Sequence, residues 1–561
     1  MNSPKQGISD LPEICLQHGL THVVIAPGSR NAPLIASFSA HHKITCYSIV
    51  DERCAAYFAL GIAIQTQQPV AIICTSGTAA LNFAPAIAEA CYQNIPLVVL
   101  TADRPDEWID QADGQTIRQQ NIYANYSKQS FQLPVETLTD ADLWYFNRSV
   151  NEAINGANAE PKGPVHLNIP LREPLYAPLP KSNVEARIIQ TVYSSPILNS
   201  AQLDPLVDRW NSSAKKMIIF GAGPKNQEQI ELVKALSQDP SVVVMAENIA
   251  NLDNDLVLYA PERFFGSCSE QDAPTFQPEL LITVGHAVVS AQLKKYLRRY
   301  SSPEHWQISP SPSGIDTFQS LTKSILADPN WLLGQLVSQG KNVKSNYREL
   351  FVTKDLSLSQ WQENFISAAP FSDLKLFREV LKSIPTGSNL HLANSTPIRY
   401  SQLFKIQNTL SVHANRGTSG IDGCVSTAAG CAVSSQEPTV LISGDLSFIY
   451  DSNGLWNKAL KGNLKIILVN NGGGNIFRLI HPNEGENPAR DFQETPHNVN
   501  LKQLALAFGA THAICHSEGE LAGQLASFFQ PSDKVGILEI VTDVAVNTAV
   551  YKDYYKQIKS I

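Results

Sequence analysis

Short apolar runs alternate with helical patterns along the first hundred residues of the chain. These runs are HVVIA from His22, TCYSIV from Thr45, VAIICT from Val70 and LVVLT from Leu97. Short runs rich in β-branched residues and separated by helical segments are typical of parallel strands in an α/β sheet. We therefore predict an α/β domain here, followed by an extended linker at the proline-rich stretch 170–180, PLREPLYAPLP.

The same alternation returns twice further along. A second pattern begins near Lys216 with MIIFGAGP and continues to HWQIS, which ends at Ser309, and a third follows the polar stretch 339–346. RCAAYFALGIA around Cys54 is matched by GCVSTAAGCAV around Cys424, either by chance or because two domains are alike. We predict three α/β domains with parallel sheets, two similar ones flanking a Rossmann-like central domain, over residues 1–182, 183–350 and 351–561.

Composition and charge narrow the functional class. The 561 residues include 43% hydrophobic and 17% charged residues, which excludes disorder as the main state. The net charge of −8 predicts no nucleic-acid partner and no membrane partner. Nine cysteines without a C-x-x-C pair favour a reducing cytoplasm, and the N-terminus shows no pattern of an export signal. We therefore expect a soluble cytoplasmic protein.

The strongest chemical signal lies between residues 439 and 477. We expect a strand at 439–443, a helix at about 452–461 and a strand at 464–469, so that Asp445 and Asn471 each follow the carboxyl end of a strand. In a right-handed βαβ unit these ends lie side by side, at the edge where open α/β sheets bind ligands. A carboxylate, an amide oxygen and a loop carbonyl, that of Gly473, would form an all-oxygen site suited to Mg²⁺, with Mn²⁺ as a substitute.

Here the sequence resembles the thiamine-diphosphate enzymes, whose signature is Gly-Asp, 25 to 30 residues, then Asn-Asn. Gly444 and Asp445 begin the signature, and Asn471 lies 26 residues after Asp445. Leu446 stands where the general signature has a third glycine. The plain alternative is an ordinary βαβ unit with an acidic turn and an Asn-Gly turn. The resemblance implies that this loop holds the metal and the cofactor diphosphate.

Enzymes with this signature also need a glutamate, in the first domain, that acts on the cofactor. Asp51 and Glu52 follow the run TCYSIV and precede a helical pattern with apolar positions. Without the resemblance, an acidic pair at this place complements the dipole of a helix N-terminus. The resemblance implies instead that Glu52 is catalytic, hydrogen-bonding the aminopyrimidine of the cofactor and promoting removal of the thiazolium proton.

Further stretches resemble one family, the 2-succinyl-5-enolpyruvyl-6-hydroxy-3-cyclohexene-1-carboxylate synthases of menaquinone and phylloquinone biosynthesis. They extend over nearly the whole chain in order: APGSRNAPL (26–34), DERCAAYFALG (51–61), TSGTA (75–79), LTADRP (100–105), ANSTPIR (393–399), NRGTSGIDG (415–423), GDLSF (444–448) and NNGGGNIF (470–477). In this family the leucine after Gly-Asp is expected, so Leu446 narrows the choice.

The resemblance implies a transferase, a homodimer or homotetramer, that depends on thiamine diphosphate and a divalent metal. Such an enzyme decarboxylates 2-oxoglutarate and adds the succinyl carbanion equivalent to isochorismate. The cofactor carries the chemistry, and the protein supplies orientation and charge. Two alternatives stay open at this point: another thiamine-dependent 2-oxo acid decarboxylase or carboligase that acts on pyruvate, and a non-catalytic homologue that binds the cofactor.

Site residues carry over by motif. Both substrates bear two carboxylates, which arginine binds well. The resemblance implies carboxylate-binding arginines, residues that orient substrates or move protons, a residue that props the cofactor, and an apolar wall: respectively Arg30, Arg104, Arg399 and Arg416; Ser29, Gln115 and Ser395; Ile421; and Ile476 with Phe477.

Three features depart from the expected patterns. Gly114 precedes Gln115 where the family leads us to expect asparagine. Lys294 and Lys295 stand where we expect a Lys-Arg pair for substrate binding, and a solvated basic helix face is the alternative reading. In MIIFGAGPKN the third glycine of a dinucleotide fingerprint is replaced by Asn226, so a bound nicotinamide or flavin is not expected.

Overall fold

Three parallel sheets form the scaffold of the computed structural model, which describes residues 2–182, 186–341, 343–480 and 489–561. The first sheet has the order β2-β1-β3-β4-β6-β5. Its four central strands are buried along most of their length, as expected of a parallel sheet covered on both faces, whereas the edge strands β2 and β5 are partly exposed. They are β1 (His22–Ile25), β2 (Thr45–Ser48), β3 (Val70–Cys74), β4 (Leu97–Asp103), β5 (Ser130–Gln132) and β6 (Val165–Pro170).

The third sheet repeats the strand order of the first. Its order, β13-β12-β14-β15-β17-β16, is the same permutation of six consecutive strands, which confirms the prediction of two similar domains. Its strands are β12 (Asn389–Leu392), β13 (Ser411–His413), β14 (Thr439–Gly444), β15 (Leu464–Asn470), β16 (Thr511–Cys515) and β17 (Gly536–Val541).

The middle sheet has a different order, β11-β10-β9-β7-β8. The order reverses between β7 and β9, as in doubly wound folds, so the central domain is Rossmann-like as predicted. Its strands are β7 (Lys216–Phe220), β8 (Val242–Ala246), β9 (Leu280–Val284), β10 (Glu304–Ser309) and β11 (Lys323–Leu326).

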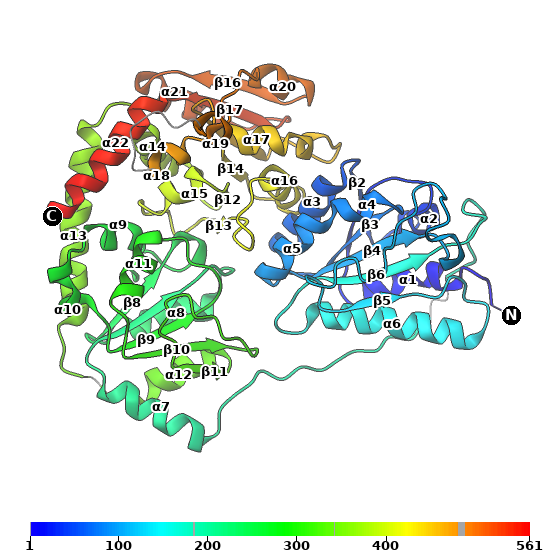
Figure 1. Cartoon of the computed structure of the whole chain (residues 1–561), viewed down its shortest axis with the longest axis horizontal. Coiled ribbons are helices and arrows are strands. Elements are labelled where there is room, and N and C mark those ends of the chain that lie inside the picture. Colours follow the sequence, from blue (N-terminus) through cyan, green and yellow to red (C-terminus); the bar gives the residue numbers. More distant parts are fainter. Residues whose placement is uncertain (1, 183–185, 342, 481–488) are drawn as a thin grey trace.

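Helices cover the faces of these sheets (Figure 1). Those of the first domain are α1 (Gln6–Gln17), α2 (Ala32–Ser39), α3 (Glu52–Thr66), α4 (Thr78–Asn82), α5 (Ala84–Gln93) and α6 (Asp140–Asn158). Those of the middle domain are α7 (Ser200–Ser212), α8 (Gln227–Leu236), α9 (Pro261–Ser267), α10 (Ala273–Phe276), α11 (Ala291–Arg299) and α12 (Pro329–Gln339).

Helix α13 (Tyr347–Ala368) joins the middle and third domains, packing on α9, α10 and β8 of one and on α14 of the other. The predicted boundary at 350/351 therefore falls inside a helix, and the one at 182/183 adjoins residues 183–185, outside the described residues. The domain limits stay predictions. The remaining helices are α14 (Asp373–Ser383), α15 (Thr396–Ser401), α16 (Cys424–Ser434), α17 (Asp445–Tyr450), α18 (Ile476–Ile480), α19 (Arg490–Glu494), α20 (Leu501–Ala507), α21 (Glu518–Phe528) and α22 (Val544–Gln557).

The helix expected at about 452–461 was predicted wrongly. The chain instead forms α17 directly at Asp445, then a short 3₁₀ turn over Ser452–Leu455, and no helix over 456–461. Asn457 explains the difference, because its side chain accepts from the backbone N–H of Ala459 and donates to the carbonyl of Gly454. Such local bonds compete with helical ones.

The first domain meets the third through α3 and α16, which cross near the centre of the molecule (Figure 1). Buried residues of both helices belong to one apolar cluster, which also includes residues of β3 and β15. The core is thus continuous from the first domain to the third. None of the helices in the described ranges is long and apolar enough to cross a membrane.

Candidate active site

The loop after β14 places a buried carboxylate at the carboxyl edge of the third sheet. Asp445 begins α17 with 2% of its surface exposed. Its Oδ2 accepts from the backbone N–H groups of Gly472 and Gly473, each at 2.9 Å, and its Oδ1 accepts from Leu446 at 2.7 Å. Burial raises the pKa of Asp445, and these hydrogen bonds and nearby His497 oppose the rise. The two predicted loops thus lie side by side.

Asn471 lies in the second loop, and the two polar atoms of its carboxamide have different surroundings. Its Nδ2 donates to Oδ2 of Asp373 at 3.2 Å. Its Oδ1 is buried and accepts no hydrogen bond within the described residues. A buried acceptor without a partner costs about 1–3 kcal/mol. An oxygen-binding cation such as Mg²⁺ would satisfy it, so Asp445 and Asn471 fit the expected metal.

Two glycines follow Asn471 at positions that disfavour a side chain. Gly472 has φ +80°, a conformation that favours glycine, and a Cβ on Gly473 would lie 2.6 Å from the carbonyl oxygen of Glu494. His497 also faces this loop, with Nε2 3.3 Å from Oδ2 of Asp445. His497 was not among the residues predicted from the sequence, because it lies in no recognisable motif.

Predicted residues of α17, α18 and the preceding loops surround this carboxylate. Gly444 ends β14, and a Cβ there would meet nothing within 4 Å. The carbonyl of Ile421 accepts from Ser447 Oγ at 3.1 Å, which ties the NRGTSGIDG loop to α17. Leu446, Ile476 and Phe477 are half-buried. They supply apolar surface next to the two loops.

Three cationic side chains from two domains, Lys294, Arg399 and Arg416, lie close enough to influence one another electrostatically. Arg416 donates to Oδ1 of Asn394 at 2.8 Å. Burial lowers the pKa of Arg416, and the charge of Arg399 lowers it further. Burial also lowers the pKa of Lys294, which the carboxylate of Glu247 raises and Arg416 lowers. Such a cluster suits a ligand with several carboxylates.

The two lysines of the predicted pair lie on different faces of α11. Lys294 is half-buried on α11 toward Arg416, whereas Lys295 is exposed. Glu247, which sequence reasoning missed, is buried, and its carboxylate accepts from the N–H groups of Val289 at 2.6 Å and Ser290 at 2.5 Å. It thereby fixes the turn from which α11 starts.

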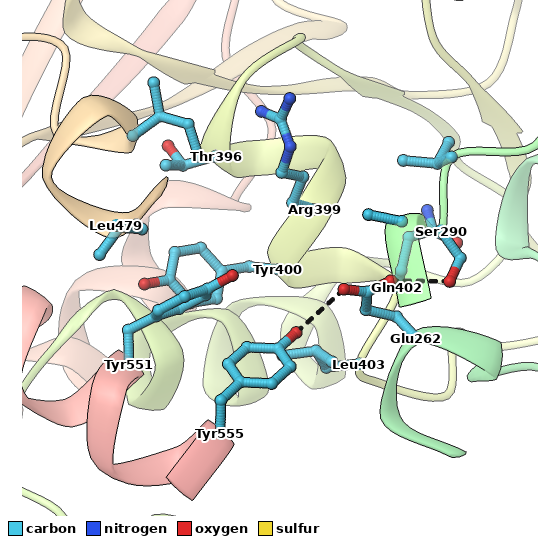
Figure 2. Close-up of a pocket in the computed structure, with 13 residues that line it drawn as sticks. Glu262, Ser290, Thr396, Arg399, Tyr400, Gln402, Leu403, Leu479, Tyr551 and Tyr555 are labelled. Atoms are coloured by element: carbon cyan, nitrogen blue, oxygen red, sulfur yellow. Dashed lines mark hydrogen bonds between the residues drawn. The ribbon is translucent and has the colours of Figure 1, made fainter. Parts of the chain in front are cut away.

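A pocket adjoins this cluster between the middle and third domains, and the space inside it, open solvent included, is about 460 Å³. Figure 2 shows Arg399 on one side and a group of tyrosines on the other. Glu262 accepts from Ser290 Oγ at 2.7 Å and from the hydroxyl of Tyr555 at 3.3 Å. The lining residues are Glu262, Val289, Ser290, Ala291, Thr396, Arg399, Tyr400, Gln402, Leu403, Ile476, Leu479, Tyr551 and Tyr555.

Ser395 lies directly before α15, beside this pocket, in a strained conformation. Its φ is +76°, which a residue with a side chain rarely adopts. Asn394 holds the turn by donating to the carbonyls of Asn415 at 2.7 Å and Gly420 at 2.6 Å. The motifs ANSTPIR and NRGTSGIDG are therefore parts of one loop assembly.

A separate group of predicted residues lies at the edge of the first sheet. Arg104 donates to the carbonyl of Gly114 at 2.7 Å and pairs with Asp113 at 3.1 Å. Gln115 is exposed at φ +54°, and its backbone packs against Gly77. A Cβ on Gly114 would meet nothing within 4 Å, so this departure from the family pattern has no steric cause within the chain.

Arg30 is held by hydrogen bonds to other parts of the first domain. It is 5% exposed, and its guanidinium donates to the carbonyl of Leu171 at 2.9 Å, while its backbone N–H donates to Thr75 Oγ1 at 3.2 Å. Its neighbour Ser29 is exposed. Arg30 therefore anchors the PGSR loop to the TSGT loop and to the end of β6, and its contact with substrate stays a prediction.

Glu52 is the first residue of α3, and the preceding residue, Asp51, caps this helix. Asp51 caps the helix by accepting from the N–H of Cys54 at 3.1 Å, and it also accepts from Asn453 at 2.9 Å. The half-buried Glu52 makes no hydrogen bond or ion pair with any other described residue.

Residues next to Glu52 contact the third domain, although Glu52 itself does not bond to the described residues of the metal loops. Among the described residues, no hydrogen bond or ion pair links the group formed by Glu52, Arg104 and Gln115 to Asp445 or Asn471. The flanking residues do make contact, since Arg53 donates to the carbonyl of Tyr450 at 2.8 Å.

Comparisons with known proteins define the class. Residues 6–123 match the family described as thiamine pyrophosphate enzyme, N-terminal TPP binding domain, and residues 395–540 match the corresponding C-terminal TPP binding domain. With its repeated sheet order and its Gly-Asp and Asn-Gly loops, the chain is a thiamine pyrophosphate enzyme, and thiamine pyrophosphate is another name for thiamine diphosphate.

Relatives over the full length give the particular family. The chain is 42% identical to a protein of Flavobacterium psychrophilum (97% of this chain, 98% of the relative), 40% identical to one of Flavobacterium johnsoniae (97% and 98%) and 38% identical to one of Bacteroides fragilis (100% of both). All three are named 2-succinyl-5-enolpyruvyl-6-hydroxy-3-cyclohexene-1-carboxylate synthase. The chain belongs to this family of synthases, as the resemblance of its motifs predicted.

Proposed function

We propose that the chain decarboxylates 2-oxoglutarate and joins the remaining succinyl group to isochorismate, a transferase step of menaquinone or phylloquinone biosynthesis in the cytoplasm. The observation that carries this proposal is the grouping of Lys294, Arg399 and Arg416 in a protein of net charge −8. Such a local concentration of cations suits substrates that each bear two carboxylates.

We assign the binding of the metal and the cofactor to residues at the carboxyl edges of the first and third sheets. Asp445, Asn471 and the backbone at Gly473 would hold Mg²⁺ or Mn²⁺, and the unpartnered Oδ1 of Asn471 supports this assignment. Thiamine diphosphate, when bound, would supply a nucleophilic carbon for the keto group and an electron sink for the decarboxylation. Ile421 and Leu446 would support it from the third domain.

Glu52 has the role of binding the cofactor and moving its proton. Because its carboxylate is half-buried and has no partner in the described chain, it is free to hydrogen-bond an aminopyrimidine nitrogen and stabilise the tautomer that removes the thiazolium proton. Arg30, Arg104, Ser29, Gln115 and Ser395 would orient the substrates or move protons.

We also propose an oligomer, which the resemblance to thiamine-diphosphate enzymes implies. In a homodimer or homotetramer, the Glu52 edge of one copy would close over the Asp445 edge of another and complete the site. Sedimentation analysis of the holoenzyme tests this. A monomer that retains full activity at high dilution would overturn it.

The two alternative functions are not favoured. A pyruvate decarboxylase or carboligase has no need for three grouped cations, because pyruvate carries one carboxylate. A non-catalytic homologue has no need to retain both Glu52 and the Asp445–Asn471 pair.

Release of carbon dioxide separates these functions. The holoenzyme is given 2-oxoglutarate with and without isochorismate, with pyruvate as the control. Release that isochorismate accelerates and pyruvate does not produce supports the proposal. Release from pyruvate alone would overturn the substrate assignment, and no release from either substrate would favour the non-catalytic homologue.

A further inference from the structure

Asp373 is a buried carboxylate that lies far from the metal loops in sequence and next to them in space. It is the first residue of α14 and is 0% exposed. Its Oδ1 accepts from Thr542 Oγ1 at 2.7 Å, and its backbone N–H donates to Oδ1 of Asn547 at 2.8 Å. These bonds fix its position from the residues at the start of α22. Its remaining oxygen, Oδ2, accepts from Nδ2 of Asn471.

The chemistry of this bond determines which way the Asn471 carboxamide faces. An ionised carboxylate only accepts hydrogen bonds, so the amide nitrogen of Asn471 must face Asp373 and its oxygen must face away. That oxygen is the buried Oδ1 without a partner in the described chain. Without Asp373, the carboxamide could rotate and present its nitrogen, which repels a cation.

We propose that Asp373 is a positioning residue for the metal site, which orients the Asn471 carboxamide so that its oxygen is available to the cation. This inference rests on the proposed metal role of Asn471 and deepens it. Groups that orient metal ligands typically change metal affinity about 10–100-fold when they are removed. Asp373 acts through Asn471 and touches neither the metal nor substrate.

A purely structural role for Asp373 is the competing explanation, because its bonds also hold α14 to the start of α22. Thr542→Val separates the two roles. It removes the hydrogen bond to Oδ1 of Asp373 and the one that Thr542 Oγ1 accepts from Nδ2 of Asn547 at 3.0 Å, but leaves the one between Oδ2 and Asn471. It is therefore a matched control that weakens the local hydrogen bonding without releasing the carboxamide of Asn471.

The test is a titration of Mn²⁺ into the full-length protein with thiamine diphosphate, with free Mn²⁺ followed by electron paramagnetic resonance. We expect Asp373→Asn to weaken Mn²⁺ binding about 10–100-fold, because the new amide can donate to Oδ1 of Asn471. Thr542→Val should stay within about twofold of wild type. Asp373→Ala, which removes the acceptor without adding a donor, gives a second reading if the asparagine variant does not fold.

A double-mutant cycle completes the test. If Asp373 acts through Asn471, then Asp373→Asn has no further effect on Mn²⁺ affinity in an Asn471→Ala background. Equal affinity in wild type and Asp373→Asn, or an equal loss in Asp373→Asn and Thr542→Val, would overturn the positioning role alone. A wild-type protein that binds no Mn²⁺ would overturn the metal site and this role together.

Discussion

Gly61 of α3 and Gly430 of α16 each lie against the backbone of the other helix. A Cβ on Gly61 would lie 2.0 Å from the carbonyl oxygen of Thr427, and a Cβ on Gly430 would lie 1.9 Å from that of Phe58. The two helices can approach so closely only because both residues lack side chains. This crossing connects the domain that carries Glu52 to the domain that carries Asp445.

Gly61→Ala should therefore loosen the contact between the first and third domains. The added methyl group cannot fit without moving a helix backbone, and such overpacking costs about 1–3 kcal/mol. Hydrogen exchange of α3 and α16 should become faster and the midpoint of thermal unfolding lower. Gly523→Ala on exposed α21 is the control, because its Cβ would meet nothing within 4 Å. Equal exchange rates in both variants would contradict the close crossing.

Glu52→Gln should keep the fold and lower turnover about 10²–10⁴-fold, the range for losing a positioned acid–base group. Asp51, which remains, caps α3, so the helix should form unchanged. Steady-state rates and circular dichroism measure the two expectations, with the exposed Glu437→Gln as control. A near-normal rate in Glu52→Gln would remove this residue from the mechanism.

The two neighbouring lysines on α11 should differ in their effect on substrate binding. Lys294 is half-buried between Glu247 and Arg416, whereas Lys295 is exposed. Lys294→Ala should raise KM about 10–100-fold for at least one substrate, because a hydrogen bond to a charged group contributes about 1.5–3 kcal/mol. Lys295→Ala should raise it much less. Steady-state kinetics with each substrate varied in turn decides the matter, and a larger effect at Lys295 would reverse the assignment.

The fold was largely predictable from the chain because short β-branched runs and their spacing determine parallel sheets. The likeness of the first and third domains was visible around Cys54 and Cys424 and reappears as an identical strand order. The pairing of Asp445 with the loop of Asn471 was predictable as well, since one crossover places both at the same sheet edge.

The missed features depend on contacts between distant parts of the chain. Asp373, Glu247 and His497 lie in no motif, and their partners are 98, 43 and 52 residues away or come from another element. Local pattern carries no information on such pairs. The wrong helix at 452–461 had a different cause, because an Asn457 side chain satisfied backbone groups that a helix would have used.

Asp103 should make the stability of the cofactor-free protein depend on pH. It is 3% exposed at the end of β4, and burial raises its pKa to about 6, although Asn168 and the N–H of Arg104 donate to it at 2.8 and 2.7 Å. Unfolding returns the carboxyl to its ordinary pKa, so the folded state holds a proton that the unfolded state releases. The stabilising contribution is thus complete below about pH 4 and is lost as the pH rises through about 6.

Asp103→Asn removes this titration. The free energy of unfolding of wild type minus that of the variant should fall by about 2 kcal/mol between pH 4 and pH 6.5, since one pKa unit corresponds to about 1.4 kcal/mol and the unfolded carboxyl is already partly ionised at pH 4. Urea unfolding of both proteins at several pH values measures the difference, in which the other titrating groups cancel. Asp208→Asn, at an exposed site, should give a difference that does not vary with pH. A constant difference for Asp103→Asn would show that its carboxyl is ionised in the folded protein across this range.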